Sequence, residues 1–141
     1  MVFLKRLLSL TLLCWCVLSF ATEVSLKDKI GQMLILGFDG KTIDKNSPIV
    51  KAIDESNIGG VILFDYDAQT KLFDKNIASP EQVKLLNQQL QSANEIANLA
   101  HHRKNLPLLI SVDYEGGRVT RLKEEYGFPA TLSAKTLGSI L

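Results

Sequence analysis

Short, uninterrupted runs of hydrophobic residues recur along this chain. Three of them, residues 33–38, 59–64 and 108–112, are apolar at almost every position, and an aspartate directly follows each one. Runs of this length predict β-strands rather than helices. Because side chains on both alternating faces are apolar, the pattern predicts strands that are buried on both faces. We therefore expect three internal strands.

The segments before these runs have the spacing of amphipathic helices. Each begins at a serine that can cap the first turn, namely Ser25, Ser47 and Ser79. A proline follows the second and third serines, as is typical of the first helical position. A glutamine three residues after Ser79 is placed to reach back to that cap. The second and third helices are expected to extend to about Glu55 and His101, and the polar segment between the second strand and the third helix is expected to be a loop.

The alternation of helix and apolar strand predicts an α/β fold with a parallel sheet covered by helices. Two architectures fit this order, a doubly wound open sheet and a (β/α)8 TIM barrel. A barrel needs roughly 250 residues, and this chain has 141. In the barrel interpretation, the chain therefore carries only about the first three βα units.

The N-terminus has the pattern of a secretory signal peptide. Lys5 and Arg6 precede an apolar run at residues 7–20, which is shorter than the roughly 20 residues of a membrane-spanning helix. Ser19 and Ala21 place small residues at the −3 and −1 positions of a cleavage site. The pattern predicts export, to the periplasm of a bacterium, and a retained membrane anchor is the alternative interpretation.

The predicted organisation is a signal peptide at residues 1–21 and a single incomplete domain at residues 22–141, with no membrane association after cleavage. Cys14 and Cys16 both lie within the signal peptide, so the mature domain has no disulfide framework. The formal net charge of +1 provides no basic stripe for a nucleic acid. Composition does not predict the oligomeric state.

Polar residues gather where the predicted strands end, at residues 38–40, 65–67 and 113–121. In both candidate architectures, ligands bind at the carboxyl ends of the strands. The third segment, within SVDYEGGRVTRL at residues 111–122, is the richest in charge. It is the leading candidate for a functional site.

Within this segment, Asp113 and Glu115 point to the same side if the strand continues that far. The Gly116–Gly117 pair leaves room for a ligand or a tight turn. Arg118 and Arg121 share a face if a helical turn follows. A carboxylate beside a guanidinium suits a polyhydroxylated ligand, although a structural salt bridge explains the same pair. We take Asp113 and Arg121 as the candidate ligand contacts, with Glu115, Gly116, Gly117 and Arg118 as the loop scaffold.

Other candidates are weaker. His101 and His102 are adjacent, so they cannot present both rings to one metal from a helix face, and we predict no metal site. Asp65 and Asp67 could bind a cation from an extended segment, but a solvated loop is the favoured interpretation. Ser111 lacks the sequence of a hydrolase nucleophile elbow.

Four segments together resemble the N-terminal part of glycoside hydrolase family 3, in its bacterial β-N-acetylhexosaminidase branch: KIGQMLILGF, IGGVILF, NIASPEQVKLLNQQLQ and LLISVDYEGGRVTRL. The resemblance runs from about Leu26 to Leu137. It implies a (β/α)8 barrel and removal of terminal β-linked N-acetylglucosamine from peptidoglycan fragments during wall recycling. It also implies a retaining reaction through a glycosyl-enzyme intermediate on an aspartate, with a histidine as acid/base and no metal or organic cofactor.

The resemblance also implies residue roles. Asp113 corresponds to an aspartate that hydrogen-bonds the sugar hydroxyls, and Arg121 to an arginine that contacts the same sugar; neither is catalytic. Tyr114 stands where a glutamine is more usual. The family's K-H-F-P-G-H segment, its acid/base histidine and its nucleophilic aspartate are expected beyond residue 141, so this chain alone is expected to be inactive. A non-catalytic glycan-binding remnant and an unrelated doubly wound domain that binds an anion at residues 115–118 are the alternatives.

Overall fold

The computed structural model describes residues 24–117 and 119–140. The predicted signal peptide, its two cysteines and Arg118 lie outside the described residues. The elements in chain order are α2 (Leu26–Gly31), β1 (Ile35–Gly37), α3 (Pro48–Ser56), β2 (Gly60–Leu63), α4 (Pro80–Ala100), β3 (Leu109–Val112), the 3₁₀ helix η1 (Glu124–Tyr126) and α5 (Ala134–Ile140). The expected alternation of helix and strand is confirmed, although each strand is shorter than its apolar run.

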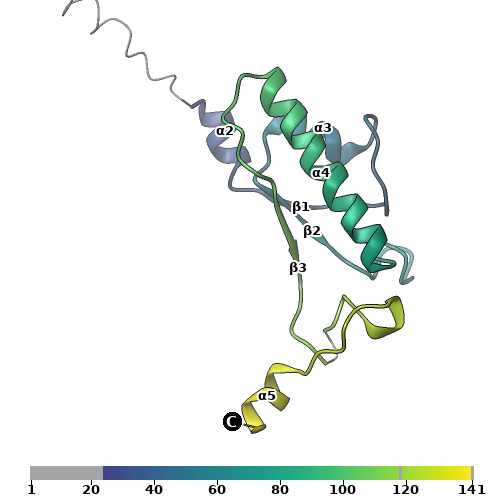
Figure 1. Ribbon diagram of the computed structural model, residues 1–141. Coiled ribbons are helices and arrows are strands. Elements are labelled where there is room, and N and C mark those ends of the chain that lie inside the picture. The colour runs from purple at the N-terminus through teal and green to yellow at the C-terminus, as the bar shows by residue number, and fades with distance from the viewer. Residues whose placement is uncertain (1–23, 118, 141) are drawn as a thin grey trace, which may run out of the picture.

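The three strands form one parallel sheet in the order β1-β2-β3 (Figure 1). Val61 of β2 pairs with Leu36 of β1 on one side and with Ile110 of β3 on the other. Parallel strands need a crossover between them, and here α3 and α4 supply the two crossovers. The prediction of an α/β fold with a parallel sheet is therefore confirmed.

The hydrophobic core lies between the sheet and the crossover helices α3 and α4. β2 contributes Val61 and Leu63, while α3 contributes Ile49 and Ile53. From α4, Leu86, Leu90 and Ala97 occupy successive turns of one face, which is the apolar stripe that the sequence predicted. The core therefore lies on one side of the sheet.

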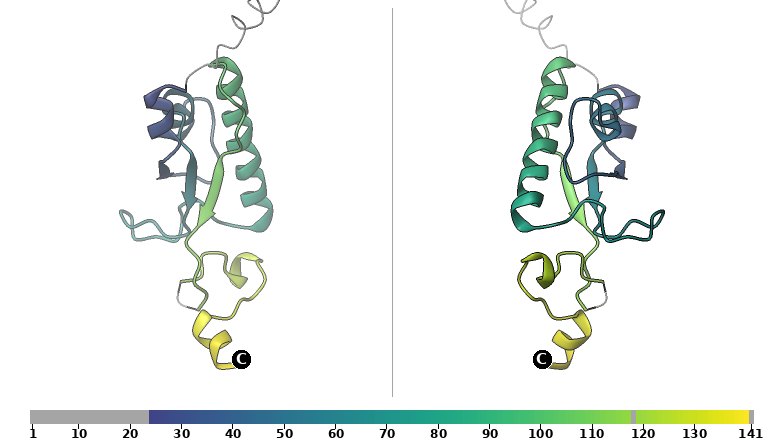
Figure 2. Two further views of the ribbon diagram at one scale, coloured as in Figure 1. Left: turned by 90° about the vertical axis from the view of Figure 1, so that its left-hand side faces the viewer. Right: turned by 90° about the vertical axis from the view of Figure 1, so that its right-hand side faces the viewer.

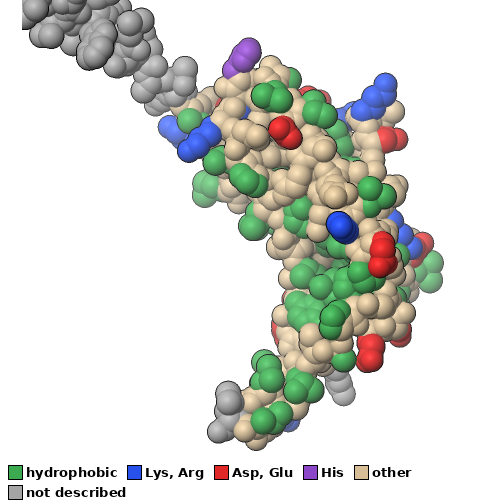
Figure 3. All heavy atoms as spheres, viewed as in Figure 1, with side chains coloured by type: hydrophobic (Ala, Val, Ile, Leu, Met, Phe, Trp, Pro, Cys, Tyr) green, Lys and Arg blue, Asp and Glu red, His purple; other side chains and the backbone are tan. Residues whose placement is uncertain are grey.

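The two outer strands are not buried on both faces, and for them the sequence-based expectation is wrong. Ile35 in β1 and Leu109 in β3 are exposed large apolar residues, whereas three of the four residues of β2 are buried. The reason is position, because in the described part of the chain β1 and β3 each have only one strand neighbour. Figure 3 also shows hydrophobic side chains gathered around α5, where Leu137 and Ile140 are exposed.

The helix starts follow the predicted capping pattern in part. The hydroxyl oxygens of Ser25 and Ser79 accept hydrogen bonds from backbone amides three residues later, as N-caps do. Ser47 does not cap α3, because its hydroxyl oxygen accepts a hydrogen bond from the amide of Asp44 instead. Gln82 reaches back to the amide of Ala78 rather than to the cap residue itself. Among the described residues, none of the helices has the length and apolar composition to span a membrane.

Two side-chain amides, one buried and one half-buried, hold the backbone at the two ends of the sheet. Asn76 is fully buried, and its side-chain nitrogen donates to the carbonyl oxygens of Phe38 and Gly40 beyond β1. Its side-chain oxygen accepts a hydrogen bond from the amide of Phe64 at the end of β2. Asn76 therefore links the segments that follow two neighbouring strands. At the other end of the sheet, the side-chain amide of Gln91 in α4 donates a hydrogen bond to the backbone carbonyl oxygen of the residue before β3 and accepts one from its backbone amide.

Candidate functional site

The charged residues of the candidate site lie at the carboxyl edge of the sheet. Asp113 directly follows β3, and Asp65 lies two residues beyond the end of β2. Leu63 pairs with Val112 in the sheet, so both strands deliver their following residues to the same edge. Figures 1 and 2 show residues 124–140 beyond this edge, on the side toward which β3 points. The predicted location of the site at the strand ends therefore coincides with a cluster of charge.

Arg121 connects the two strand ends. Its Nη2 lies 3.2 Å from Oδ2 of Asp113, and its Nη1 lies 3.4 Å from Oδ1 of Asp65. The Asp113 side chain is 41% exposed, whereas that of Asp65 is fully buried at 0%. One guanidinium therefore joins a carboxylate open to solvent with a carboxylate inside the protein. The sequence singled out Asp113 and Arg121 together, and the structure places them in contact.

The sequence pattern indicates Asp65 only as a weak cation ligand beside Asp67, and not as a partner of Arg121. A solvated loop was the favoured interpretation for Asp65 and Asp67, and for Asp65 that interpretation is wrong because this side chain is fully buried. Asp67 differs from Asp65 in that its carboxylate accepts a hydrogen bond from the amide of Gln69. The backbone amides of Gln69 and Thr70 outweigh desolvation and lower the pKa of Asp67. The available signal for Asp65 was that it directly follows the second apolar run, as Asp113 follows the third.

Lys123 is a second cation on the buried carboxylate. Its Nζ lies 2.9 Å from Oδ2 of Asp65 and 3.6 Å from Oε1 of Glu125. The same ammonium lies 3.6 Å from the centroid of the Phe73 ring, within the range of a cation–π interaction. Burial by itself lowers the pKa of Lys123, but contacts with Asp65 and Tyr126 outweigh it, and the pKa is raised. Lys123 is therefore a fixed positive charge in the neutral pH range.

The loop from Asp113 to Leu122 does not have the local structure that was expected. β3 ends at Val112, so Asp113 and Glu115 do not lie on a continuing strand. Residues 119–122 form no helical turn that could place Arg121 on a shared face. Instead, Gly116 pairs with Val119 in a tight bridge, and the amide of the exposed Glu115 donates to the carbonyl oxygen of Val119. The contact between Asp113 and Arg121 therefore arises from a tight turn.

The backbone conformation of the turn explains the glycines at positions 116 and 117. Gly116 has φ +75° and Gly117 has φ +59°, in the left-handed region that favours glycine. A Cβ on Gly116 would also lie only 2.5 Å from the carbonyl oxygen of Leu132. These glycines allow residues 132–133 to pack against the turn.

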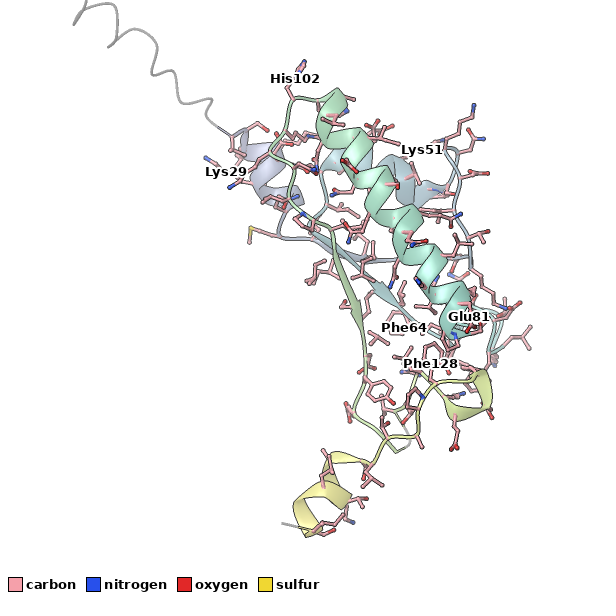
Figure 4. The ribbon with its side chains drawn as sticks, in the orientation of Figure 1. Lys29, Lys51, Phe64, Glu81, His102 and Phe128 are labelled. Atoms are coloured by element: carbon pink, nitrogen blue, oxygen red, sulfur yellow. The ribbon has the colours of Figure 1, made fainter. Side chains whose placement is uncertain are left out.

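Of the other candidate residues, His101 and Ser111 have structural partners. His102 lies at the opposite end of α4 from Phe64, which directly precedes Asp65 (Figure 4). The ring of His101 contacts Asp54, with 2.9 Å between Nε2 and Oδ1. Ser111 donates from its hydroxyl to the carbonyl oxygen of Val61. In residues 24–117 and 119–140 there is no group of three or more His, Cys, Asp or Glu side chains placed to hold a metal ion.

The chain has a parallel sheet with helical crossovers, and carboxylates and cations meet at the carboxyl ends of its strands. These features are typical of the class of α/β proteins whose ligands bind at that edge. Residues 25–139 match the family model described as the glycosyl hydrolase family 3 N terminal domain. This chain belongs to that family. The family's N-terminal domain is a TIM-barrel-like α/β fold, so the alternative of an unrelated doubly wound domain is wrong.

Curated relatives and solved structures agree with the family. A beta-hexosaminidase from Bordetella avium (strain 197N) is 36% identical over 83 residues, which cover 59% of this chain and 18% of the relative. A beta-hexosaminidase from Nitrosomonas eutropha (strain DSM 101675 / C91 / Nm57) is 32% identical over 107 residues, which cover 76% of this chain and 24% of the relative. The glycoside hydrolase family 3 beta-N-acetylglucosaminidase from Paenibacillus sp. str. FPU-7 superposes with a TM-score of 0.64 at 34% identity, covering 82% of this chain and 18% of that one.

A beta-N-acetylhexosaminidase from Beutenbergia cavernae DSM 12333 superposes with a TM-score of 0.60 at 26% identity, covering 83% of this chain and 30% of that one. Among the curated relatives that it matches, the chain spans about a fifth of their length, from 18% to 24%. At the level of the family, these relatives support glycoside hydrolase activity on N-acetylglucosamine.

Proposed function

We propose that this chain is the N-terminal part of a retaining glycoside hydrolase that removes terminal β-linked N-acetylglucosamine from peptidoglycan fragments. Its own contribution is to bind the terminal sugar at Asp113 and Arg121. The observation that carries the proposal is the contact between these two side chains at the carboxyl edge of the sheet, within the family match. About three βα units of a TIM barrel supply this wall of the sugar site.

The charge pattern of the pair suits a sugar. Oδ2 of Asp113 faces Arg121, and in the described part of the chain its Oδ1 has no hydrogen-bond partner. A carboxylate oxygen in this position can accept hydrogen bonds from sugar hydroxyls. The Arg121 side chain is 23% exposed, although its Nε is buried without a partner among the described residues, so the terminal nitrogens of the guanidinium are its donors toward a ligand. The pair thus offers both an acceptor and donors to a polyhydroxylated ligand.

Binding rather than bond cleavage is the proposed role of these carboxylates. Retaining hydrolysis requires a nucleophilic carboxylate and a separate acid/base group. Asp113 and Asp65 are both held by Arg121, which suits substrate positioning rather than attack on the sugar. We place the nucleophilic aspartate and the acid/base histidine beyond residue 141, and we propose no metal or organic cofactor. The 141-residue chain is then a sugar-binding unit that does not hydrolyse alone.

Hydrolysis of a chromogenic β-N-acetylglucosaminide tests this proposal. The 141-residue chain should release no chromophore, whereas a chain extended through an in-frame K-H-x-P-G-H segment should release it. A chain extended in this way but still inactive on the N-acetylglucosaminide would overturn the proposed activity. Hydrolysis by the 141-residue chain alone would show that the catalytic groups lie within it.

Export to the periplasm is part of the proposal and rests on the first 21 residues. Mass spectrometry of the chain from a bacterial periplasmic fraction should show cleavage after Ala21. Recovery of the uncleaved chain from the membrane fraction would support the alternative, a retained anchor, and would contradict this part of the proposal.

A further inference from the structure

We propose that Asp65 is the positioning residue of the site: it anchors the guanidinium of Arg121, so that Asp113 is left to accept hydrogen bonds from the sugar. The role of Arg121 toward a sugar rests on the proposed function. The anchoring itself rests on the contacts of the buried carboxylate.

The backbone around Asp65 fixes where its carboxylate lies. Asp65 follows the central strand, and its carbonyl oxygen accepts a hydrogen bond from the amide of Lys75 at 3.3 Å. The neighbouring Phe64 is held on both backbone groups by Asn76, whose side chain accepts from its amide and whose amide donates to its carbonyl oxygen. Asp65 is therefore attached to the most buried part of the sheet and to the loop that folds back over it.

The two carboxylates that contact Arg121 differ in their surroundings. The Asp65 side chain is fully buried, so water does not compete for its charge, while the Asp113 side chain is partly open to solvent. A charge contact in a low-dielectric environment is stronger than the same contact in water. A ligand hydroxyl can reach Asp113 but cannot reach Asp65. When a sugar engages Asp113, the contact with Asp65 still holds Arg121.

Asp65 also holds the second cation of the cluster. In the described part of the chain, its Oδ2 is buried and receives no directed hydrogen bond, so its partner there is the charge of Lys123 at 2.9 Å. Removal of the Asp65 charge would leave Arg121 and Lys123 near one another without the carboxylate that separates them. The guanidinium of Arg121 should then move away from Lys123 and out of the site.

The face of the Phe64 ring supports the same placement of the guanidinium. The Cζ of Arg121 lies 5.8 Å from the centroid of that ring, within the range of a cation–π contact. Phe64 and Asp65 are consecutive residues after β2, so the same short segment supplies both the ring and the carboxylate that face Arg121. The position of Arg121 is thus set by β2 as well as by its own loop.

Nuclear magnetic resonance of the ¹⁵N-arginine-labelled 141-residue chain tests this assignment directly, with the Arg121 signals assigned by comparison with Arg121→Lys. A guanidinium held by a buried carboxylate rotates slowly and gives separate Nη signals. We expect slow rotation in the wild-type chain and in Asp113→Asn, and fast rotation in Asp65→Asn. As a matched control, Asp39→Asn removes a carboxylate that contacts Lys75 at the same sheet edge, and rotation should stay slow.

Titration with N-acetylglucosamine adds a readout that a purely structural role would not change. We expect Asp65→Asn to weaken binding by about tenfold or more, because a charge-assisted contact that orders the donor is lost, and Asp39→Asn to leave it unchanged. If Asp65→Asn keeps slow rotation or full affinity, the assignment is wrong. If Asp65→Asn does not fold, Asp113→Asn decides: loss of slow rotation there would make Asp113 the anchor and overturn the proposal.

The two proposals fail in different ways. If the wild-type chain does not bind N-acetylglucosamine at all, the proposed sugar contact fails. The rotation of the Arg121 guanidinium in Asp65→Asn and Asp113→Asn still decides whether Asp65 anchors it, because that measurement needs no ligand.

Discussion

Asp65 and Asp113, which follow neighbouring strands, contact the two different terminal nitrogens of one guanidinium, that of Arg121. One carboxylate is buried and the other reaches solvent. A site of this kind combines a rigid support with an accessible acceptor, which is what positioning a polar ligand requires.

Asn76→Ala should destabilise the chain strongly. The variant removes two donated hydrogen bonds and one accepted hydrogen bond from a fully buried position, leaving backbone groups of Phe38 and Phe64 without partners. Each unsatisfied buried group costs about 1–3 kcal/mol, so we expect a loss of roughly 3 kcal/mol in the free energy of unfolding by urea denaturation. Asn46→Ala, at an exposed position, is the control. Equal stability of the two variants would contradict the role given to Asn76.

Gly116→Ala should disturb the turn that carries the site. An alanine at φ +75° is strained, and its Cβ would meet the carbonyl oxygen of Leu132, at a cost of about 1–3 kcal/mol. Gly138→Ala is the matched control, because nothing lies within 4 Å of a Cβ at that helical position, and alanine there should be neutral or stabilising. Limited proteolysis should cut Gly116→Ala faster than the wild type. Unchanged proteolysis would show that the turn tolerates a side chain.

Stability should fall in acid partly through Asp28. The hydrogen bond from Ser25 lowers the pKa of Asp28, and contributions from Asn57 and Arg103 add to it despite the opposing effect of burial. A carboxyl with a lowered folded pKa stabilises the fold fully above its unfolded value of 3.8, and that stabilisation is lost as the pH falls through the folded pKa.

Asp28→Asn should therefore reduce stability at neutral pH and flatten its pH dependence in that acidic window. Unfolding by urea at several pH values measures this, with Glu95→Gln on the exposed side of α4 as the control. If Asp28→Asn retains the full acid dependence of the wild type, Asp28 is not the group responsible.

The chain on its own should self-associate while it keeps its fold, because in the described part of the chain the outer edge of β3 has no strand partner. Leu109 in β3 is 55% exposed, and Leu109→Lys should reduce association by placing a charge at this edge. Leu85→Lys is the matched control, since Leu85 is 50% exposed but lies on α4. Sedimentation velocity at several concentrations measures the effect. A wild-type chain that stays monomeric at every concentration would show the prediction to be wrong.

The sequence predicted the order of elements and their parallel pairing because apolar runs and serine caps are local signals. It could not tell β2 from the outer strands, since Val61 and Leu109 lie in equally apolar runs and differ only in how many neighbours they have. Periodicity reports that a side chain is suited to burial. It does not report what covers that side chain.

The site was predictable where its residues are close in sequence. Asp113 and Arg121 lie in one short motif, so their contact could be expected, although the tight turn at Gly116 and not a helix brings them together. Asp65 could not be assigned to the same cluster from a local pattern. Its contact with Arg121 depends on the register between β2 and β3, which the sequence does not state.

Titration of the 141-residue chain with N-acetylglucosamine, followed by calorimetry and amide chemical shifts, tests the proposed sugar contact at Asp113 and Arg121 most directly. Asp113→Asn keeps the shape of the side chain but removes its charge, and Glu115→Gln makes the same change on an exposed residue of the same turn. We expect shift changes around Asp113 and Arg121, affinity about tenfold or more weaker in Asp113→Asn, and unchanged affinity in Glu115→Gln. No binding by the wild-type chain, or equal binding by the two variants, would contradict the proposed contact.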